Sequence, residues 1–374
     1  MSNESNELVV KPAPHITGTM SKNRIMQYTF VAILAVTIVT SALWSQVTTP
    51  SGWNLGLTVA LGALIAVGIA VLVDLGIGKW TSDSEVNTWS AAVFGLIVIN
   101  CYTLGIPSMI IGSGLEVGIP VEAPLAFFYI ALIALIGEVV FKKVASLAGK
   151  KFVNPAAAAK FLVLLPSLPV TLLTALHTIN GMLKVPSLSG PIGQTIINGN
   201  GGGTGYQSFY GYLQSCYASS ATSTQSVESL MLLAKYHGWV GGASSIAVII
   251  AGIALFAIGR KYFKWKITAS YLVAIAVLSL IFSVAFGDGD LTTRLLFEVF
   301  IGSSIFLAFF MATDPATTPF SGIGQIIFGV GLAVLTILIQ TFMGFFGGSL
   351  LALLIMNLTV PLIDKVRIDK PFGR

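Results

Sequence analysis

Charged residues are scarce in this sequence. Asp, Glu, Lys and Arg make up 9% of the 374 residues, whereas hydrophobic residues make up 55% and the mean hydropathy is +0.88. A soluble domain carries about 25% charged residues, so this chain has too few to cover a water-facing surface. We therefore predict an integral membrane protein. The net charge of +5 comes from short basic clusters between apolar runs, a membrane pattern, and no nucleic-acid partner is expected.

Residues that ligate metals are also scarce. The two cysteines, Cys101 and Cys216, are too few for an iron–sulfur cluster or a four-thiolate zinc site. They are expected to be small apolar residues rather than a disulfide. The three histidines, His15, His177 and His237, have no ligand spacing along a helix. We expect no metal site.

Apolar runs of membrane-spanning length dominate the rest of the chain. A crossing helix needs about 20 mostly apolar residues. Ten such runs are found at 26–46, 55–76, 88–106, 123–145, 156–177, 238–258, 267–286, 292–312, 324–341 and 346–364. The expected fold is an all-α membrane protein of about ten transmembrane helices. Its parts are an N-terminal segment, a five-helix half, a polar loop, a second five-helix half and a tail, at 1–25, 26–178, 179–237, 238–364 and 365–374.

Basic residues give these spans an orientation. Ten spans place 16 of the 20 Lys and Arg residues on one face, three on the other, and Lys160 inside the fifth span. The positive-inside rule makes the crowded face cytoplasmic. Both termini are then inside and the 179–237 loop is outside. A span count wrong by one would remove this asymmetry, so the charges favour ten.

Prolines interrupt the third and eighth spans. Five spans on each side of the loop give two halves of opposite orientation, as in inverted-repeat transporters. The third span runs into Pro107 and the eighth into Pro315, at corresponding positions. Proline removes a backbone donor and disfavours helix just before it. Two interpretations stay open: a central site built from exposed backbone groups, or prolines that only end helices at the interface.

Two Asx-Pro pairs accompany these features. Asn154 and Pro155 open the fifth span as N-cap and first helical residue, and Asp314 and Pro315 have the same form after the eighth. Each pair either caps a helical segment or lines a central site. The alanines at 156–159 fit a tight helix contact or a packed flavin ring equally well.

Two acids lie inside apolar spans. Glu138 and Glu298 are candidates for an ion path, because ionisable groups within a membrane are costly to bury. Alternatively, Glu138 pairs with Lys142 at the i, i+4 spacing, and Glu298 reaches the outer interface.

Four stretches carry a resemblance to a known family. Ser219-Ser220-Ala221-Thr222 resembles the Ser-Gly-Ala-Thr acceptor at which some membrane redox subunits carry flavin mononucleotide (FMN). The others are a Pro-His-Ile opening at 14–16, the Asn-Pro-Ala segment at 154–156 and Met-Ala-Thr-Asp-Pro at 311–315. Together they resemble the RnfD family of Rnf electron-transport complexes. The related NqrB protein of the sodium-pumping quinone reductase lacks the Pro-His-Ile opening.

This resemblance implies a urea/ammonium-transporter-like fold in the cytoplasmic membrane. It further implies a covalent FMN, phosphoester-linked to Thr222, and riboflavin held among the helices. The implied partners are the other Rnf subunits, of types A, B, C, E and G, and a flavin transferase. The implied activity passes electrons from ferredoxin while sodium ions or protons are exported. Ser220 and Thr224 depart from the family's Gly and Leu. An NqrB-like protein, a cofactor-free channel or transporter, and a structural subunit with vestigial flavin sites remain alternatives.

Overall fold

The computed structural model describes residues 21–46, 48, 52–81, 87–105, 123–145, 151–165, 232, 237–260, 262–286, 295–301, 304–343 and 348–365. The first half holds α1 (Lys22–Trp44), α2 (Leu55–Thr81), α3 (Thr88–Cys101), β1 (Thr103–Gly105), α5 (Leu125–Ile136), the π-helix η1 (Gly137–Val144) and α7 (Pro155–Leu164). The second half holds β2 (His237–Trp239), the 3₁₀ turn η2 (Val240–Gly242), α12 (Ser245–Gly259), α13 (Trp265–Phe286), η3 (Phe297–Ile301), α15 (Ser304–Phe306), η4 (Leu307–Met311), α16 (Gly322–Met343) and α17 (Gly348–Lys365).

Small polar residues start several of these helices. The side chains of Ser21, Asn87 and Ser244 accept hydrogen bonds of 3.1–3.3 Å from the first turns of α1, α3 and α12. Each satisfies a backbone donor that the helix leaves unpaired. The predicted cap of α7 is confirmed, with Asn154 as N-cap and Pro155 as the first helical residue.

All ten predicted spans contain helix, but they are not equally long. Among the described residues, α1, α2, α5 with η1, α13, α16 and α17 are long and apolar enough to cross a membrane. The apolar helices α3, α7 and α12 have 14, 10 and 15 residues, and the eighth segment is divided among η3, α15 and η4. The all-helical membrane class is confirmed, and the count of ten stays a prediction.

Apolar side chains face outward as well as inward. Leu64 and Leu72 of α2 are each 70% exposed and Val284 of α13 is 73% exposed. Large exposed apolar surfaces of this kind indicate contact with a membrane. Together with the six long apolar helices, they define a multi-pass membrane protein.

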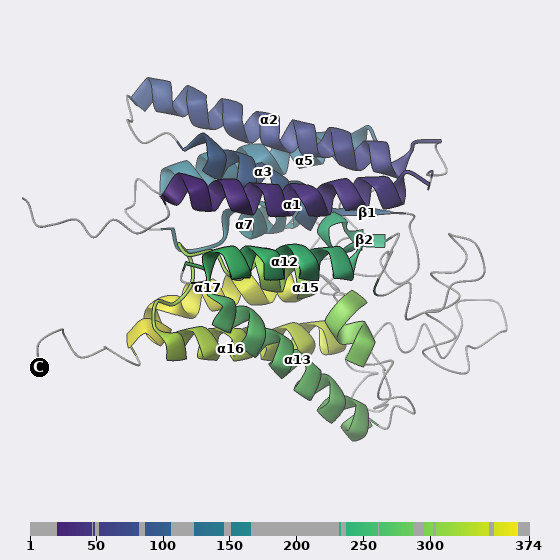
Figure 1. The fold of residues 1–374 in the computed structure, drawn as a ribbon, viewed down its shortest axis with the longest axis vertical. Coiled ribbons are helices and arrows are strands. Elements are labelled where there is room, and N and C mark those ends of the chain that lie inside the picture. Colours follow the sequence, from purple (N-terminus) through teal and green to yellow (C-terminus); the bar gives the residue numbers. More distant parts are fainter. Residues whose placement is uncertain are drawn as a thin grey trace, which may run out of the picture.

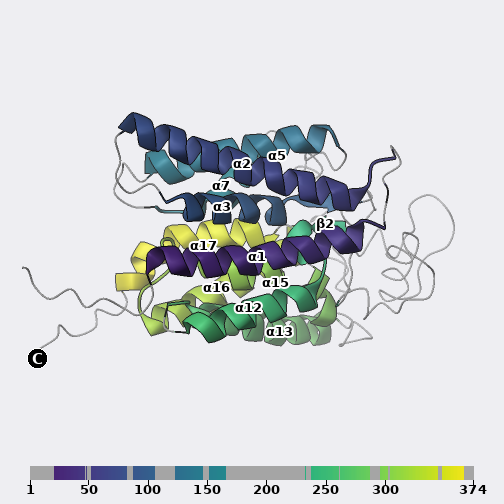
Figure 2. The same cartoon turned by 45° about the horizontal axis from the view of Figure 1, so that its top comes forward.

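The two halves lie side by side. Figures 1 and 2 both show α2, α3 and α5 on one side of the molecule and α12, α13 and α16 on the other. The first helix of each half meets the other, since α1 packs on α12, and so do the last, since α7 packs on α17. Within the first half, Gly95 lets α3 approach α2 closely. A Cβ there would lie 2.6 Å from Val67 Cα.

The third and eighth segments are both interrupted. Helix α3 ends at Cys101, earlier than the predicted 106, because Tyr102 is extended (ψ 143°) and the chain continues as β1. Strand β1 pairs with β2 of the other half, with Thr103 opposite Trp239. This pairing satisfies backbone groups that a helix would otherwise satisfy internally. In the eighth segment, helix stops at Met311 and turns follow.

Candidate functional site

A cavity of about 530 Å³ lies between the two halves, at the end of the molecule where α1 begins. Its volume is within the range of about 300–1,000 Å³ that is typical of small-molecule sites. Both halves line it, through Lys22, Ile25, Met26, Thr29, Val93, Ile97, Leu255, Tyr262, Phe263, Phe309, Phe310, Thr313, Asp314, Pro315 and Ala316. Its walls are mostly apolar and aromatic, with a few polar groups.

Buried and exposed lining residues differ in character. Phe309 and Phe310 of η4 are each 5% exposed and provide two aromatic rings. Lys22 is exposed and Asp314 is half-buried, so charged groups lie where the cavity opens. This arrangement suits a molecule with a flat apolar ring and a polar tail.

Asp314 caps a turn rather than a helix. Its Oδ1 accepts a 3.0 Å hydrogen bond from the backbone N of Ala316, and Oδ2 accepts a longer one, 3.5 Å, from Thr317 Oγ1. The predicted helical segment beginning at Pro315 is wrong, because turns follow it. Pro319 disfavours helix at the residue before it, which leaves too little chain for a helical turn.

A lysine holds this turn in place. Lys264 Nζ donates to the carbonyl oxygens of Pro315 (3.2 Å) and Thr318 (2.9 Å) and to Thr318 Oγ1 (2.7 Å). It also lies 5.1 Å from the centre of the Phe320 ring. Because carbonyls after a helix end carry partial negative charge, an ammonium group stabilises them. The sequence placed Lys264 only in a basic loop.

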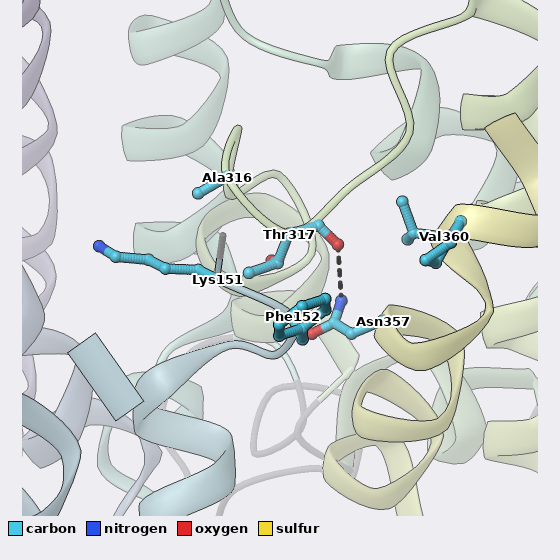
Figure 3. Close-up of a pocket in the computed structure, with 7 residues that line it drawn as sticks. Lys151, Phe152, Ala316, Thr317, Asn357 and Val360 are labelled. Atoms are coloured by element: carbon cyan, nitrogen blue, oxygen red, sulfur yellow. Dashed lines mark hydrogen bonds between the residues drawn. The ribbon is translucent and has the colours of Figure 1, made fainter. Parts of the chain in front are cut away.

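Asn154 reaches the same turn from α7. Its Nδ2 donates to Met311 O (3.3 Å), and its backbone N donates to Asn357 Oδ1 (2.9 Å). Asn357 Nδ2 in turn donates to Thr317 O at 3.2 Å, as drawn in Figure 3. Asn154, Asn357, Met311 and Thr317 thus form one buried set of hydrogen bonds, which we call the polar junction.

The structure therefore brings the two Asx-Pro pairs to neighbouring places with different surroundings. Asp314 and Pro315 line the large cavity. Asn154 and Pro155 are buried beside it, and Asn154 Oδ1 is occupied by the backbone N of Ala156 and Ala157. The pocket at the junction, shown in Figure 3, has about 10 Å³, room for no more than about one water. Asn357 was missed, although a lone amide inside the tenth apolar run was a signal.

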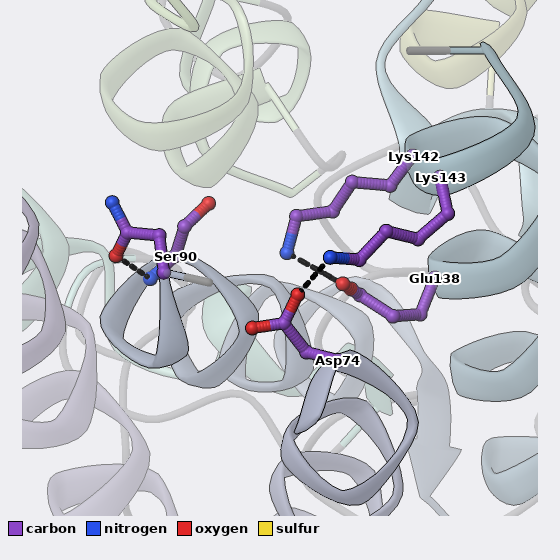
Figure 4. Close-up of polar contacts among 6 residues, drawn as sticks. Asp74, Ser90, Glu138, Lys142 and Lys143 are labelled. Carbon is purple, nitrogen blue, oxygen red and sulfur yellow. Dashed lines mark hydrogen bonds and ion pairs between the residues drawn. The ribbon is translucent and has the colours of Figure 1, made fainter. Parts of the chain in front are cut away.

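The predicted pairing of Glu138 is confirmed. Its Oε1 lies 2.7 Å from Lys142 Nζ, and Glu138 is fully buried. Beside this pair, Lys143 of η1 makes an ion pair with Asp74 of α2, as Figure 4 shows. Asp74 is 2% exposed. Four charges thus join α2 to η1 with equal numbers of each sign.

Glu298 belongs to a different place. It is 4% exposed in η3, which packs on α13 of the second half. Ser304 Oγ donates to its backbone oxygen at 3.3 Å. Glu138 is in η1, which packs on α2, α5 and α7. The two acids therefore belong to separate halves rather than to one cluster.

The remaining predicted site residue is Thr222, which lies outside the described residues, as does most of the 179–237 loop. Within the ranges given above, no three His, Cys, Asp or Glu side chains gather as metal ligands would.

Apolar helices, an outward apolar surface and interrupted segments around a cavity define a multi-pass membrane protein with an internal site for a small molecule or ion. More particularly, the chain belongs to the NQR2, RnfD, RnfE family, whose model matches residues 9–373. This bears out the family resemblance.

Relatives of known naming match over nearly the whole chain. The RnfD-type component of the Na⁺-translocating ferredoxin:NAD⁺ oxidoreductase complex of Acetobacterium woodii is 26% identical over 372 residues, 99% of this chain and 96% of that protein. The corresponding component of the ion-translocating oxidoreductase complex of Citrobacter koseri is 27% identical, covering 97% of this chain and 98% of that protein. Its counterpart in the proton-translocating ferredoxin:NAD⁺ oxidoreductase complex of Clostridium ljungdahlii is 36% identical over 145 residues, 38% of this chain and 42% of that protein.

Proposed function

We propose that this protein is the RnfD-type membrane subunit of an Rnf complex, which oxidises ferredoxin and translocates ions across the cytoplasmic membrane. The full-length match to the corresponding subunits of ion-translocating oxidoreductase complexes carries the proposal. The protein then acts with the other Rnf subunits and is not catalytic alone. The names of the relatives differ in the ion, sodium or proton, so both remain candidates for this chain.

We propose that Thr222 carries FMN through a phosphoester on its hydroxyl oxygen. The support is the Ser219–Thr222 sequence within a polar loop. The flavin performs the electron transfer, and threonine only retains it at the membrane surface. Ser220 replaces the family's glycine, so a neighbouring hydroxyl is the alternative acceptor.

Fluorescence of the denatured protein tests this assignment. The protein is produced with the flavin transferase, separated on a denaturing gel and compared with Thr222→Ala and the matched control Thr224→Ala. We expect fluorescence from the wild type and from Thr224→Ala, and none from Thr222→Ala. A dark wild-type band, with the transferase active on another substrate, would favour the vestigial-subunit or transporter alternatives.

We further propose that the 530 Å³ cavity holds riboflavin without a covalent bond. Phe309 and Phe310 offer ring contacts, and Thr313 and Asp314 offer hydrogen-bonding groups for a ribityl chain. Leu255→Trp should fill part of the cavity and lower the flavin released on denaturation, while leaving gel fluorescence unchanged. Leu358→Trp, at a position 63% exposed on α17, is the control. Equal release from both variants would place any such flavin elsewhere.

The ten segments are proposed to form a five-plus-five inverted repeat. The supporting contacts are symmetric, since the first helices of the halves pack together (α1 on α12) and so do the last (α7 on α17). The third and eighth segments are both interrupted. Both termini are proposed to be cytoplasmic. Reporter fusions at both termini and within the 179–237 loop test this, and a terminus that reports outside would contradict it.

Glu138 is the stronger of the two ion-path candidates to test. Its ion pair with Lys142 gives it a structural role, so loss of transport alone would be ambiguous. A cofactor-free transporter remains the second candidate function, supported by the interrupted helices. It predicts ion flux without electron donor in protein that contains no flavin.

A further inference from the structure

Lys160 is a fully buried lysine in the middle of α7. Its Nζ donates to the backbone oxygen of Cys101 at 2.6 Å and to Thr103 Oγ1 at 3.3 Å. The same nitrogen lies 4.6 Å from the centre of the Trp239 ring. The ammonium group thus meets a carbonyl, a hydroxyl and an aromatic face from three different segments.

These segments form the helix break of the first half. Helix α3 ends at Cys101, and the last carbonyls of a helix lack intrahelical donors and carry partial negative charge. Thr103 and Trp239 stand opposite each other in the β1–β2 pair that joins the two halves. The face of an indole ring is also electron-rich. All three groups are therefore suited to contact a cation.

In inverted-repeat transporters, the carbonyls of unwound segments and the C-terminal ends of half-helices coordinate sodium ions or protons. At this break, the position for a cation is taken by an ammonium group that is part of the chain. The methylene chain of the lysine connects it to α7, so it cannot leave as a free ion does.

The break of the second half is treated differently by the same helix. Six residues before Lys160, or about 9 Å along α7, Asn154 donates a neutral amide to Met311 O. The junction there is closed by the amides of Asn154 and Asn357. Helix α7 thus contacts both breaks and brings a cation to only one of them.

We propose that Lys160 is a tethered cation that occupies a cation-binding position at the first-half break and closes it to inorganic monovalent cations. Ions that the complex moves then do not pass through this break. The proposal goes beyond electron transfer by flavins, and it would stand if the protein carried none.

The test uses the purified complex in proteoliposomes with no electron donor present. Wild type, Lys160→Arg, Lys160→Gln and Lys160→Ala are compared in passive uptake of radioactive sodium. A second measurement records the thermal unfolding midpoint in sodium chloride and in choline chloride of equal ionic strength. Choline is too large to replace the ammonium group, so it controls for general salt effects.

We expect wild type and Lys160→Arg to be tight and to unfold at the same temperature in both salts. Lys160→Ala should take up sodium at least about tenfold faster and be stabilised by sodium relative to choline, because only a cation that binds the folded state raises its stability. Lys160→Gln, which keeps a donor but no charge, should show the same change to a smaller extent.

Two results would overturn the proposal. The first is that the neutral variants assemble, stay as tight as wild type and respond equally to both salts. The second is that neither neutral variant assembles at low or at high sodium while Lys160→Arg does. A lysine that stands in for a cation should be replaceable by one, so that second result would make Lys160 a structural brace only.

Discussion

Asn357→Leu tests the polar junction that holds α7 and α17 to the second helix break. Asn357 Oδ1 accepts from Asn154 N at 2.9 Å, and its Nδ2 donates to Thr317 O at 3.2 Å. Leucine has a similar size and can replace neither contact. The variant therefore leaves a backbone donor and a backbone acceptor unpaired in a residue environment that is 1–2% exposed.

The expected loss can be bounded from two directions. A buried polar group that loses its partner costs about 1–3 kcal/mol in soluble proteins. Side-chain hydrogen bonds between membrane helices average about 0.6 kcal/mol and reach about 1.7 kcal/mol. For two lost hydrogen bonds, we expect destabilisation of about 1–3 kcal/mol.

The assay is equilibrium unfolding of purified protein in mixed micelles with a rising fraction of denaturing detergent, followed by tryptophan fluorescence. Leu358→Met is the matched control, because Leu358 is the next residue of α17 and is 63% exposed. If Asn357→Leu changes stability by less than about 0.3 kcal/mol, as the control should, the junction does not hold the break and our argument from its hydrogen bonds is wrong.

Two further predictions concern helix packing in the first half. Glu138→Met and Lys142→Met should each destabilise the protein by about 3–5 kcal/mol by leaving one buried charge, whereas the double variant should recover most of that loss. If the stable double variant still translocates ions, Glu138 is not on the ion path. Gly95→Ala should cost about 1–3 kcal/mol, because its Cβ would lie 2.8 Å from Ala66 O and 2.6 Å from the α2 backbone. On α2, Gly68→Ala meets nothing within 4 Å and should be neutral or stabilising, so equal effects in thermal unfolding would contradict the close approach.

Local features of the site followed from the sequence, because they depend on neighbours along the chain. The cap of α7 needed only Asn154 before Pro155. The buried ion pair needed only Glu138 and Lys142 four residues apart on one helical face. Hydropathy located the helical segments, since each apolar run was long enough to be recognised on its own.

Where helices stop was less predictable. The third run is apolar as far as 106, yet α3 ends at Cys101 because β1 pairs with β2 from the other half. The eighth run is apolar throughout, and its division into η3, α15 and η4 leaves no mark in hydropathy. The helix predicted after Asp314 failed for a local reason, Pro319, that the sequence already contained.

The sequence by itself determined that this protein is a helical membrane protein of the NQR2, RnfD, RnfE family, because composition and short motifs are properties of the chain. Only the tertiary structure decided which residues meet. Asn154 and Asn357 are 203 residues apart, and Lys160 lies 59 residues from Cys101. No pattern along the chain predicts such contacts. They form because buried backbone groups at the two helix breaks must find partners, and packing brings α7 and α17 within reach.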